Sequence, residues 1–201
     1  MNRSQIKEFL GKFVENKART IVVIDFANVE KWRHSLGWPV SIKKLSQLIK
    51  YFSVGKKYLR RFYYGLDYGP HEKSTHLKKW SNFIHQQAKF SRFEIVAKRV
   101  KYIHDSNYEG GYTKKCNLDI EMAVDLIKEK SNYDTAVIFS GDGDLAYVCR
   151  YLKHELGKDV YVFGARNHIG RELIDAKNEK TIKQILFAED FKYRLNLERS
   201  S

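Results

Sequence analysis

Proline and cysteine are scarce in this chain, with two residues of each among 201. No segment rich in proline, glycine or serine and no internal repeat interrupts the sequence, so neither a linker nor a repeat array is indicated. Cys116 and Cys149 form no CxxC pair, and the seven histidines show no HExxH or zinc-ligand spacing. These absences argue against a disulfide scaffold and a zinc enzyme, and the length suits one well-filled domain.

Long apolar runs are also missing. No stretch approaches the roughly 20 residues that span a membrane, and the opening segment MNRSQIKEFLGK has no apolar signal region. We therefore expect no membrane partner and a cytoplasmic location, with a nuclear or organellar one left open. The sequence also lacks a P-loop, a GxSxG elbow and a Rossmann glycine fingerprint, which argues against NTPase, esterase and dinucleotide-dependent functions.

Acidic residues are outnumbered, because 24 Asp and Glu stand against 37 Lys and Arg, a formal net charge of +13. Such a charge favours a polyanionic partner such as nucleic acid, although it also keeps ordinary proteins in solution. Basic and aromatic residues are interleaved in residues 56–64 and 98–102, and exposed aromatic rings are known to stack on unpaired bases. We expect most aromatics of residues 56–64 to be core residues of a strand.

The second of these stretches leads into a polar, glycine-containing segment, residues 104–115. We expect this segment to be a mobile loop that contacts the substrate, with an ordinary surface connection as the alternative. The residues predicted to bind nucleic acid are Lys98, Arg99, Lys101, Tyr108, Tyr112, Lys114 and Lys115.

The most informative segment is AVIFSGDGDL, residues 136–145. A short apolar run, typical of a buried strand, breaks into an acidic turn and resumes as a helical pattern. In open parallel sheets such turns place carboxylates at the carboxyl ends of strands, where ligands bind. The glycines on both sides of Asp142 predict space for a large ligand to approach closely. Alternatively, Ser140, Asp142 or Asp144 merely caps the next helix.

Two further acids match this turn. Asp25 follows IVVI at residues 21–24, another short β-branched run, and Asn28 comes three residues later. Asp119 lies in a helix predicted over residues 116–130, near the middle of one broad apolar arc. The residues of that arc are Leu118, Ile120, Met122, Ala123, Val124, Leu126 and Ile127. We expect Asp119 to face the sheet, with Glu121, Asp125 and Lys128 opposite the arc or at its edge.

A carboxylate that faces a sheet is costly unless a cation neutralises it. A buried Arg or Lys is one candidate partner, and a metal shared by Asp25, Asp119 and Asp142 is the other. Clustered acids raise one another's pKa values, so such a set is stable mainly around a metal, which we favour. Oxygen ligands with no Cys or His nearby favour Mg²⁺ or Mn²⁺ over Zn²⁺.

Three segments resemble the NYN domain, the LabA-like branch of the PIN-like nuclease superfamily: IVVIDFANV, CNLDIEMAVDL and YDTAVIFSGDGDLAYVCRYLKHELGKDVYVFG. The resemblance runs over about residues 20–175 and is most specific at the SGDGD turn, then at D-x-x-N after the first strand. It implies a PIN-like three-layer α/β/α sandwich with a central, mainly parallel sheet, and acids that bind divalent metal for cleaving RNA. The positions that it assigns to the catalytic site are Asp25, Asn28, Asp119, Asp142 and Asp144.

One position departs from the family pattern. The family often has a lysine three residues before the helix acid, and here that position is Cys116, with Lys115 beside it as a candidate substitute.

The remaining patterns predict helices alternating with strands, and hence parallel strands joined by right-handed crossovers. Helices are predicted over residues 5–17, 41–52 with Ser41 as cap, 72–90, 116–130, 145–156 and 169–176. Strands are predicted over residues 21–24, 58–66, 93–100, 136–139 and 159–163, while residues 181–187 fit either type. As domains, we expect a helix over residues 1–19 packed on a domain of residues 20–190, then a basic tail over residues 191–201.

The function that we expect is a divalent-metal-dependent endoribonuclease that hydrolyses single-stranded or unpaired RNA. Its metal-binding residues would be Asp25, Asp119, Asp142 and Asp144. The alternatives are a non-catalytic RNA-binding or regulatory module on the same fold, a small-molecule phosphohydrolase and a DNA nuclease. The sequence leaves open the preferred RNA, the number of metal ions and the oligomeric state.

Overall fold

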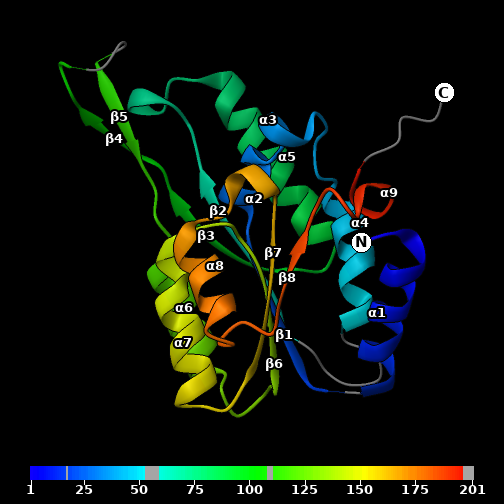
Figure 1. Cartoon of the computed structure of the whole chain (residues 1–201). Helices are drawn as coiled ribbons and strands as arrows, with labels where there is room; N and C mark the ends of the chain where they lie inside the picture. Colours follow the sequence, from blue (N-terminus) through cyan, green and yellow to red (C-terminus); the bar gives the residue numbers. More distant parts are fainter. Residues whose placement is uncertain (17, 53–58, 108–110, 197–201) are drawn as a thin grey trace.

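The computed structural model describes residues 1–16, 18–52, 59–107 and 111–196, in which helices and strands alternate along most of the chain (Figure 1). The strands of this part are β1 (Thr20–Asp25), β2 (Leu59–Leu66), β3 (Glu94–Arg99), β4 (Lys101–His104), β5 (Tyr112–Lys115), β6 (Thr135–Phe139), β7 (Asp159–Gly164) and β8 (Gln184–Phe187). Its α-helices are α1 (Arg3–Asn16), α2 (Phe26–Lys31), α3 (Arg33–Leu36), α4 (Ile42–Ile49), α5 (Thr75–Phe90), α6 (Asp119–Lys128), α7 (Ala146–His154), α8 (Arg171–Asn178) and α9 (Lys192–Leu195).

The main sheet of the described part has six strands in the order β3-β2-β1-β6-β7-β8, all parallel. The chain runs outward from β1 through β2 to β3 and then returns to β6, on the other side of β1. This reversal makes the space beyond β1 and β6 the topological switch point, where open parallel sheets bind ligands. Asp25 ends β1 and the acidic turn follows β6, so both predicted acidic segments lie at the switch point.

Helices cover both faces of the sheet, as Figure 1 shows with α6, α7 and α8 on one side and α1 and α4 on the other. Successive residues of a strand point to opposite faces. Ile21 and Val23 accordingly pack with α6, α7 and α8, whereas Val22 and Ile24 pack with α1, α4 and α5. These four side chains are fully buried. The predicted three-layer α/β/α fold with a parallel sheet is therefore confirmed.

The C-terminal end of the described chain belongs to the folded domain. Phe191 and Leu195 are fully buried in the core shared with α1 and α4, and Asn196 forms a β-bridge with Val40. The prediction of a basic tail from residue 191 is therefore wrong as far as residue 196, because these apolar side chains fill the core. Residues 197–201 lie outside the described residues.

Most predicted elements are present, with ends that differ by a few residues. Ser41 caps α4 as predicted, whereas α5 begins after Ser74, because the hydroxyl of Ser74 accepts a backbone hydrogen bond from its first turn. Residues 184–187, which fit either type, are strand β8. The aromatics of β2 are core residues as predicted, since Phe62, Tyr63 and Tyr64 are buried.

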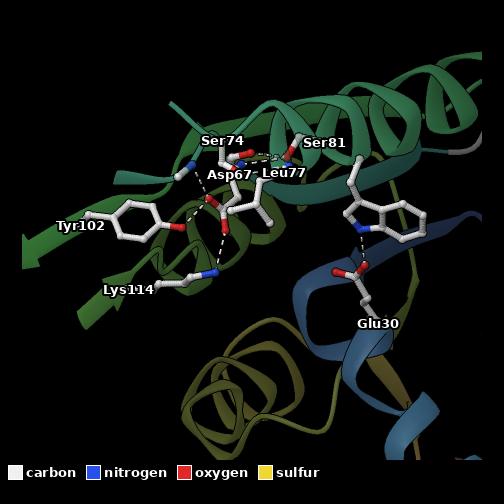
Figure 2. Close-up of polar contacts among 9 residues, drawn as sticks. Glu30, Asp67, Ser74, Leu77, Ser81, Tyr102 and Lys114 are labelled. Carbon is white, nitrogen blue, oxygen red and sulfur yellow. Dashed lines mark hydrogen bonds and ion pairs between the residues drawn. The ribbon is translucent and has the colours of Figure 1, made fainter. Parts of the chain in front are cut away.

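Residues 101–104 and 112–115 are the strands of an antiparallel hairpin, so the prediction of a loop is wrong for residue 104 and for residues 112–115. Strand β4 pairs with β5, and residues 108–110 between them lie outside the description. The Tyr102 hydroxyl and the Lys114 ammonium both bind the carboxylate of Asp67, at 2.7 and 2.9 Å, which ties the hairpin to the end of β2 (Figure 2). Strands this short and this polar carry almost no apolar alternation, so their sequence resembles a loop.

Helix α6 presents a narrower apolar face than the predicted arc. Met122 and Leu126 are buried, but Ile120 is 75% exposed and Val124 55% exposed. Asp125, predicted to lie opposite the apolar arc or at its edge, faces Arg61 of β2, with Arg61 Nη1 at 2.6 Å from its carboxylate. This orientation of the helix gives the buried guanidinium a carboxylate partner, as a buried charge requires, and leaves Ile120 exposed. Within the described residues, no helix is both long and apolar enough to cross a bilayer.

Candidate active site

Three aspartates from distant parts of the chain meet at the switch point. One carboxylate oxygen each of Asp25, Asp119 and Asp142 lies within 4.8 Å of the other two. Asp25 comes from the end of β1, Asp119 from the start of α6 and Asp142 from the turn after β6. The fold thus gathers the three acids that the sequence indicated, although Asp119 reaches the site from a helix N-terminus and not from an apolar helix face.

Asp25 is the most buried of the three, with 8% of its surface exposed. Burial raises the pKa of this carboxyl to about 6, and the charges of Asp119 and Asp142 add to that rise. Two hydrogen bonds oppose it, from the Asn28 backbone N–H at 3.1 Å and from the Ser140 hydroxyl at 2.9 Å. Near neutral pH this carboxylate therefore gains from any cation that approaches it.

The other two acids share this need for a cation. Burial raises the pKa of Asp119, and the neighbouring charge of Asp142 raises it further. In the described part of the chain none of the three acids forms a salt bridge, since nearby cations pair elsewhere: Lys98 binds Glu121 at 2.6 Å. The alternative of a buried Arg or Lys partner is therefore wrong for these residues.

The donor set of this cluster fits a hard divalent cation. Its three residues present only carboxylate oxygens, which suit Mg²⁺ or Mn²⁺ better than zinc. The carboxylates repel one another, and this repulsion contributes to the raised pKa values of Asp25 and Asp119. A bound cation would offset the repulsion. Asp144 stands outside the group of three; it is exposed, and its N–H donates to the carboxylate of Asp142 at 3.1 Å.

Ser140 positions two of these acids, and sequence reasoning treated it only as a candidate helix cap. The residue is fully buried, and its hydroxyl donates a hydrogen bond to the Asp25 carboxylate. The same hydroxyl oxygen accepts a hydrogen bond from the Asp142 backbone N–H at 3.1 Å. A hydroxyl at the last residue before the acidic turn is the only local sign of this role. Ser140 thus connects the end of β1 to the turn after β6.

The glycines beside Asp142 allow residues 168–172 to pack closely on the acidic turn. This corrects the prediction that they leave space for a ligand. A Cβ at Gly141 would collide with the backbone oxygen of His168, and one at Gly143 would collide with the carboxylate of Glu172. The N–H of Gly170 donates to the Gly141 oxygen at 2.7 Å. The segment before α8 therefore packs directly on the acidic turn and holds Asp142 in place.

Asn28 is also part of this framework. Its side-chain oxygen accepts two hydrogen bonds, from the Trp32 indole at 2.8 Å and from the Gly141 N–H at 2.9 Å. Both lone pairs of the oxygen are thereby used, so Asn28 is not a metal ligand through this atom. The residue instead fixes α2 to the acidic turn.

Replacing Ser140 with alanine tests its positioning role. We expect the free energy of unfolding of the metal-free protein to fall by about 1 kcal/mol, because Asp25 and Asp142 lose a shared hydrogen bond. The Ser140 hydroxyl lowers the pKa of Asp25, so the pH at which the Asp25 carboxyl releases its proton should move upward. Urea unfolding at a series of pH values measures both effects, with Ser46→Ala as a control that removes a buried hydroxyl on α4. An unchanged pH dependence would show that Ser140 does not act on the Asp25 carboxylate.

The basic residues predicted to bind nucleic acid fall into two groups, and the two tyrosines are apart from both. Lys98, Arg99 and Lys114 already have carboxylate partners, namely Glu121, Glu72 and Asp67. Lys101 and Lys115 are exposed and lie directly opposite each other in the β4–β5 hairpin. Tyr112 contacts His71 through its hydroxyl at 3.0 Å. Tyr108 lies outside the described residues.

Cys116, where the family often has a lysine, is half-buried beside the cluster. Its sulfur contacts the Lys98 backbone oxygen at 3.8 Å, and burial raises the pKa of its thiol. A Cβ at Gly65 would press on the Cys116 sulfur at 2.9 Å, so the side chain fills a tight space. Lys115, next to it, is exposed and belongs to β5.

Three comparisons with known proteins bear on this site. A family model described as NYN domain matches residues 19–186. The low amplitude and bright protein LabA of Synechococcus elongatus is 32% identical over 84 residues, which make up 42% of this chain and 45% of that protein. The match thus spans less than half of the relative's length. A crystal structure of a protein of unknown function from Vibrio parahaemolyticus RIMD 2210633 has the same fold, with a TM-score of 0.64, 18% identity, and coverage of 90% of this chain and 97% of that one.

Proposed function

The chain belongs to the NYN domain family, and on this premise we propose that it is a metal-dependent endoribonuclease. It hydrolyses phosphodiester bonds of single-stranded or unpaired RNA with Mg²⁺ or Mn²⁺. The observation that carries the proposal is the convergence of Asp25, Asp119 and Asp142 at the switch point of a chain with net charge +13. Such a combination suits a polyanion, because basic surroundings hold phosphates while a cation offsets the acids.

Each residue of the site has a distinct role in this proposal. Asp25, Asp119 and Asp142 would hold the cation through their carboxylate oxygens, and Asp144 would orient a second cation or a water. A bound metal makes a water more acidic and offsets charge on the reacting phosphate. Because the side-chain oxygen of Asn28 is engaged, its amide N–H₂ group is what it offers to a phosphate oxygen.

The β4–β5 hairpin supplies the contacts to the RNA backbone. Lys101 and Lys115 face each other across the strands, and like charges so placed destabilise a hairpin unless an anion lies between them. They are therefore the strongest phosphate contacts in this proposal. Lys98, Arg99 and Lys114 contribute less, since a phosphate competes with their carboxylate partners. Tyr112, and Tyr108 beyond the described part, contribute ring surface for bases.

Incubation of the purified protein with single- and double-stranded RNA and DNA, with Mg²⁺, Mn²⁺ or EDTA, tests this function. We expect divalent ions to support cleavage of single-stranded RNA and EDTA to reduce it to background. The Asp119→Asn protein, purified in parallel, controls for a contaminating nuclease. Cleavage that persists in EDTA, or that Asp119→Asn retains at the wild-type rate, would contradict the proposal.

A second candidate is a non-catalytic RNA-binding or regulatory module. The departure at Cys116 favours it, because this chain has a thiol where the family often has a lysine. RNA binding that weakens steeply with salt, without divalent-dependent products from any RNA tested, would support this candidate.

A further inference from the structure

A groove of about 630 Å³ lies beside the aspartate cluster. Its walls come from α2 and α3, the end of β2, the first half of α5 and the β4–β5 hairpin. The volume falls in the range of about 300–1,000 Å³ usual for ligand sites. Two parts of its wall are close to the cluster: α2 follows Asp25, which caps it, and Cys116 stands three residues before Asp119 and feels the charge of Asp25.

The walls of this groove are braced by internal hydrogen bonds. Asp67 accepts bonds from Tyr102 and Lys114 of the hairpin, as Figure 2 shows, and so fixes the hairpin. Ser81 of α5 donates to the Asp67 backbone oxygen and accepts its N–H, both at 2.9 Å. The hairpin and α5 are thus both fastened to the end of β2. A groove with walls held in this way is available before any ligand binds.

The acids in the groove are engaged, whereas two of its cations are available. Glu30 accepts a hydrogen bond from the Trp80 indole at 2.7 Å, and Asp67 has the partners just described. Lys31 and Arg33 line the groove and are exposed, and within the described residues no ion pair or hydrogen bond engages their side chains. The groove therefore offers unneutralised positive charge next to a cluster of acids, which suits a phosphodiester chain that passes the site.

Trp80 adds a surface for a base. The indole is 40% exposed in the groove wall, and its single N–H is satisfied by Glu30 on α2. The indole also stacks on Phe83, with a centroid distance of 5.6 Å and an interplanar angle of 26°, and this contact helps to hold the ring in place. An exposed aromatic ring that is held in place and whose N–H is already hydrogen-bonded is suited to stacking on a nucleobase.

We propose that this groove binds the RNA strand on one side of the scissile phosphate, with one unpaired base stacked on Trp80. The inference rests on the proposed function and extends it, because it gives a physical basis for the choice of single strands. Bases in a duplex already stack on their neighbours and cannot offer a face to the indole. Lys31 and Arg33 hold the adjoining phosphates.

The test measures binding without cleavage, using the full-length Asp142→Asn protein and a labelled, unstructured 12-nucleotide RNA. Trp80→Ala should weaken binding about tenfold, while Trp80→Phe, which keeps a stacking ring, should stay within about threefold. Both variants remove the hydrogen bond from the indole to Glu30. A difference in RNA affinity between them therefore measures the contribution of the aromatic ring. Phe90→Ala, which removes a 78% exposed ring at the far end of α5, is the matched control and should bind like its parent.

Tryptophan fluorescence gives a second readout. Trp32 and Trp38 are 0% and 8% exposed, so quenching by a bound base reports Trp80. We expect single-stranded RNA to quench and its perfect duplex not to, with the quench lost in Trp80→Phe. Unchanged binding in Trp80→Ala, or equal quenching by the duplex, would overturn the groove assignment even if the wild-type protein cuts RNA. Quenching without any cleavage would instead keep the groove and contradict the nuclease.

Discussion

Asp142→Asn is expected to reduce RNA cleavage by about 10³-fold or more, because the variant loses one of the three carboxylates proposed to hold the cation. The asparagine side chain still accepts the N–H of Asp144, so the turn after β6 should keep its shape. RNA binding should stay equal or become slightly tighter, since the variant removes a negative charge beside the phosphates. Single-turnover cleavage and equilibrium binding, measured at one salt concentration, separate the two effects.

The matched control is Asp175→Asn, the same substitution at an exposed residue of α8 outside the cluster. Its cleavage rate should equal that of the wild type. If Asp142→Asn also cuts RNA at the wild-type rate, the aspartate cluster is not the catalytic centre. If it loses cleavage and binding together, Asp142 acts through the fold, and a circular dichroism spectrum would show the loss.

Asp25→Asn is expected to stabilise the metal-free protein at pH 7.5 and to leave its stability unchanged below pH 4. Burial raises the pKa of Asp25 to about 6, above the ordinary value of 3.8. The folded state therefore binds the proton of the Asp25 carboxyl more tightly than the unfolded state does. This binding stabilises the folded protein at low pH, and the stabilisation is lost as the pH rises through 6. A neutral asparagine avoids that loss, so the free energy of unfolding should rise by about 2 kcal/mol.

Urea unfolding of metal-free protein at a series of pH values measures this difference. Asp175→Asn, the same substitution at an exposed residue outside the cluster, is the control for this measurement. Mg²⁺ or Mn²⁺ should stabilise the wild type above pH 6 and have little effect on Asp25→Asn, since a cation stabilises the state that binds it. Parallel pH curves for wild type and Asp25→Asn would show that Asp25 titrates normally.

The order of elements and the acids of the site could be predicted because their signals are local. Short β-branched runs such as residues 21–24, helix caps such as Ser41 and the acidic turn of residues 140–144 are each contained in a few residues. A parallel sheet then places the residues after β1 and β6 at one edge. From this rule Asp25 and Asp142 could be assigned to one site without coordinates.

The orientation of α6 could not be predicted in the same way. Its sequence carries apolar residues over most of its circumference, so periodicity alone does not fix which side faces the sheet. In the folded chain Asp125 of α6 forms a buried ion pair with Arg61, which stands 64 positions earlier in the sequence. No local pattern contains that contact.

The sequence by itself thus determined the α/β class, the parallel strands and the acids at their ends, because each depends on neighbouring residues. Only the tertiary structure decided that Ser140 holds Asp25, that the glycines beside Asp142 receive the segment before α8, and that Asp67 fastens the hairpin. These contacts join residues far apart in the chain. Their energies depend on packing and on hydrogen-bond geometry, which exist only once the chain has folded.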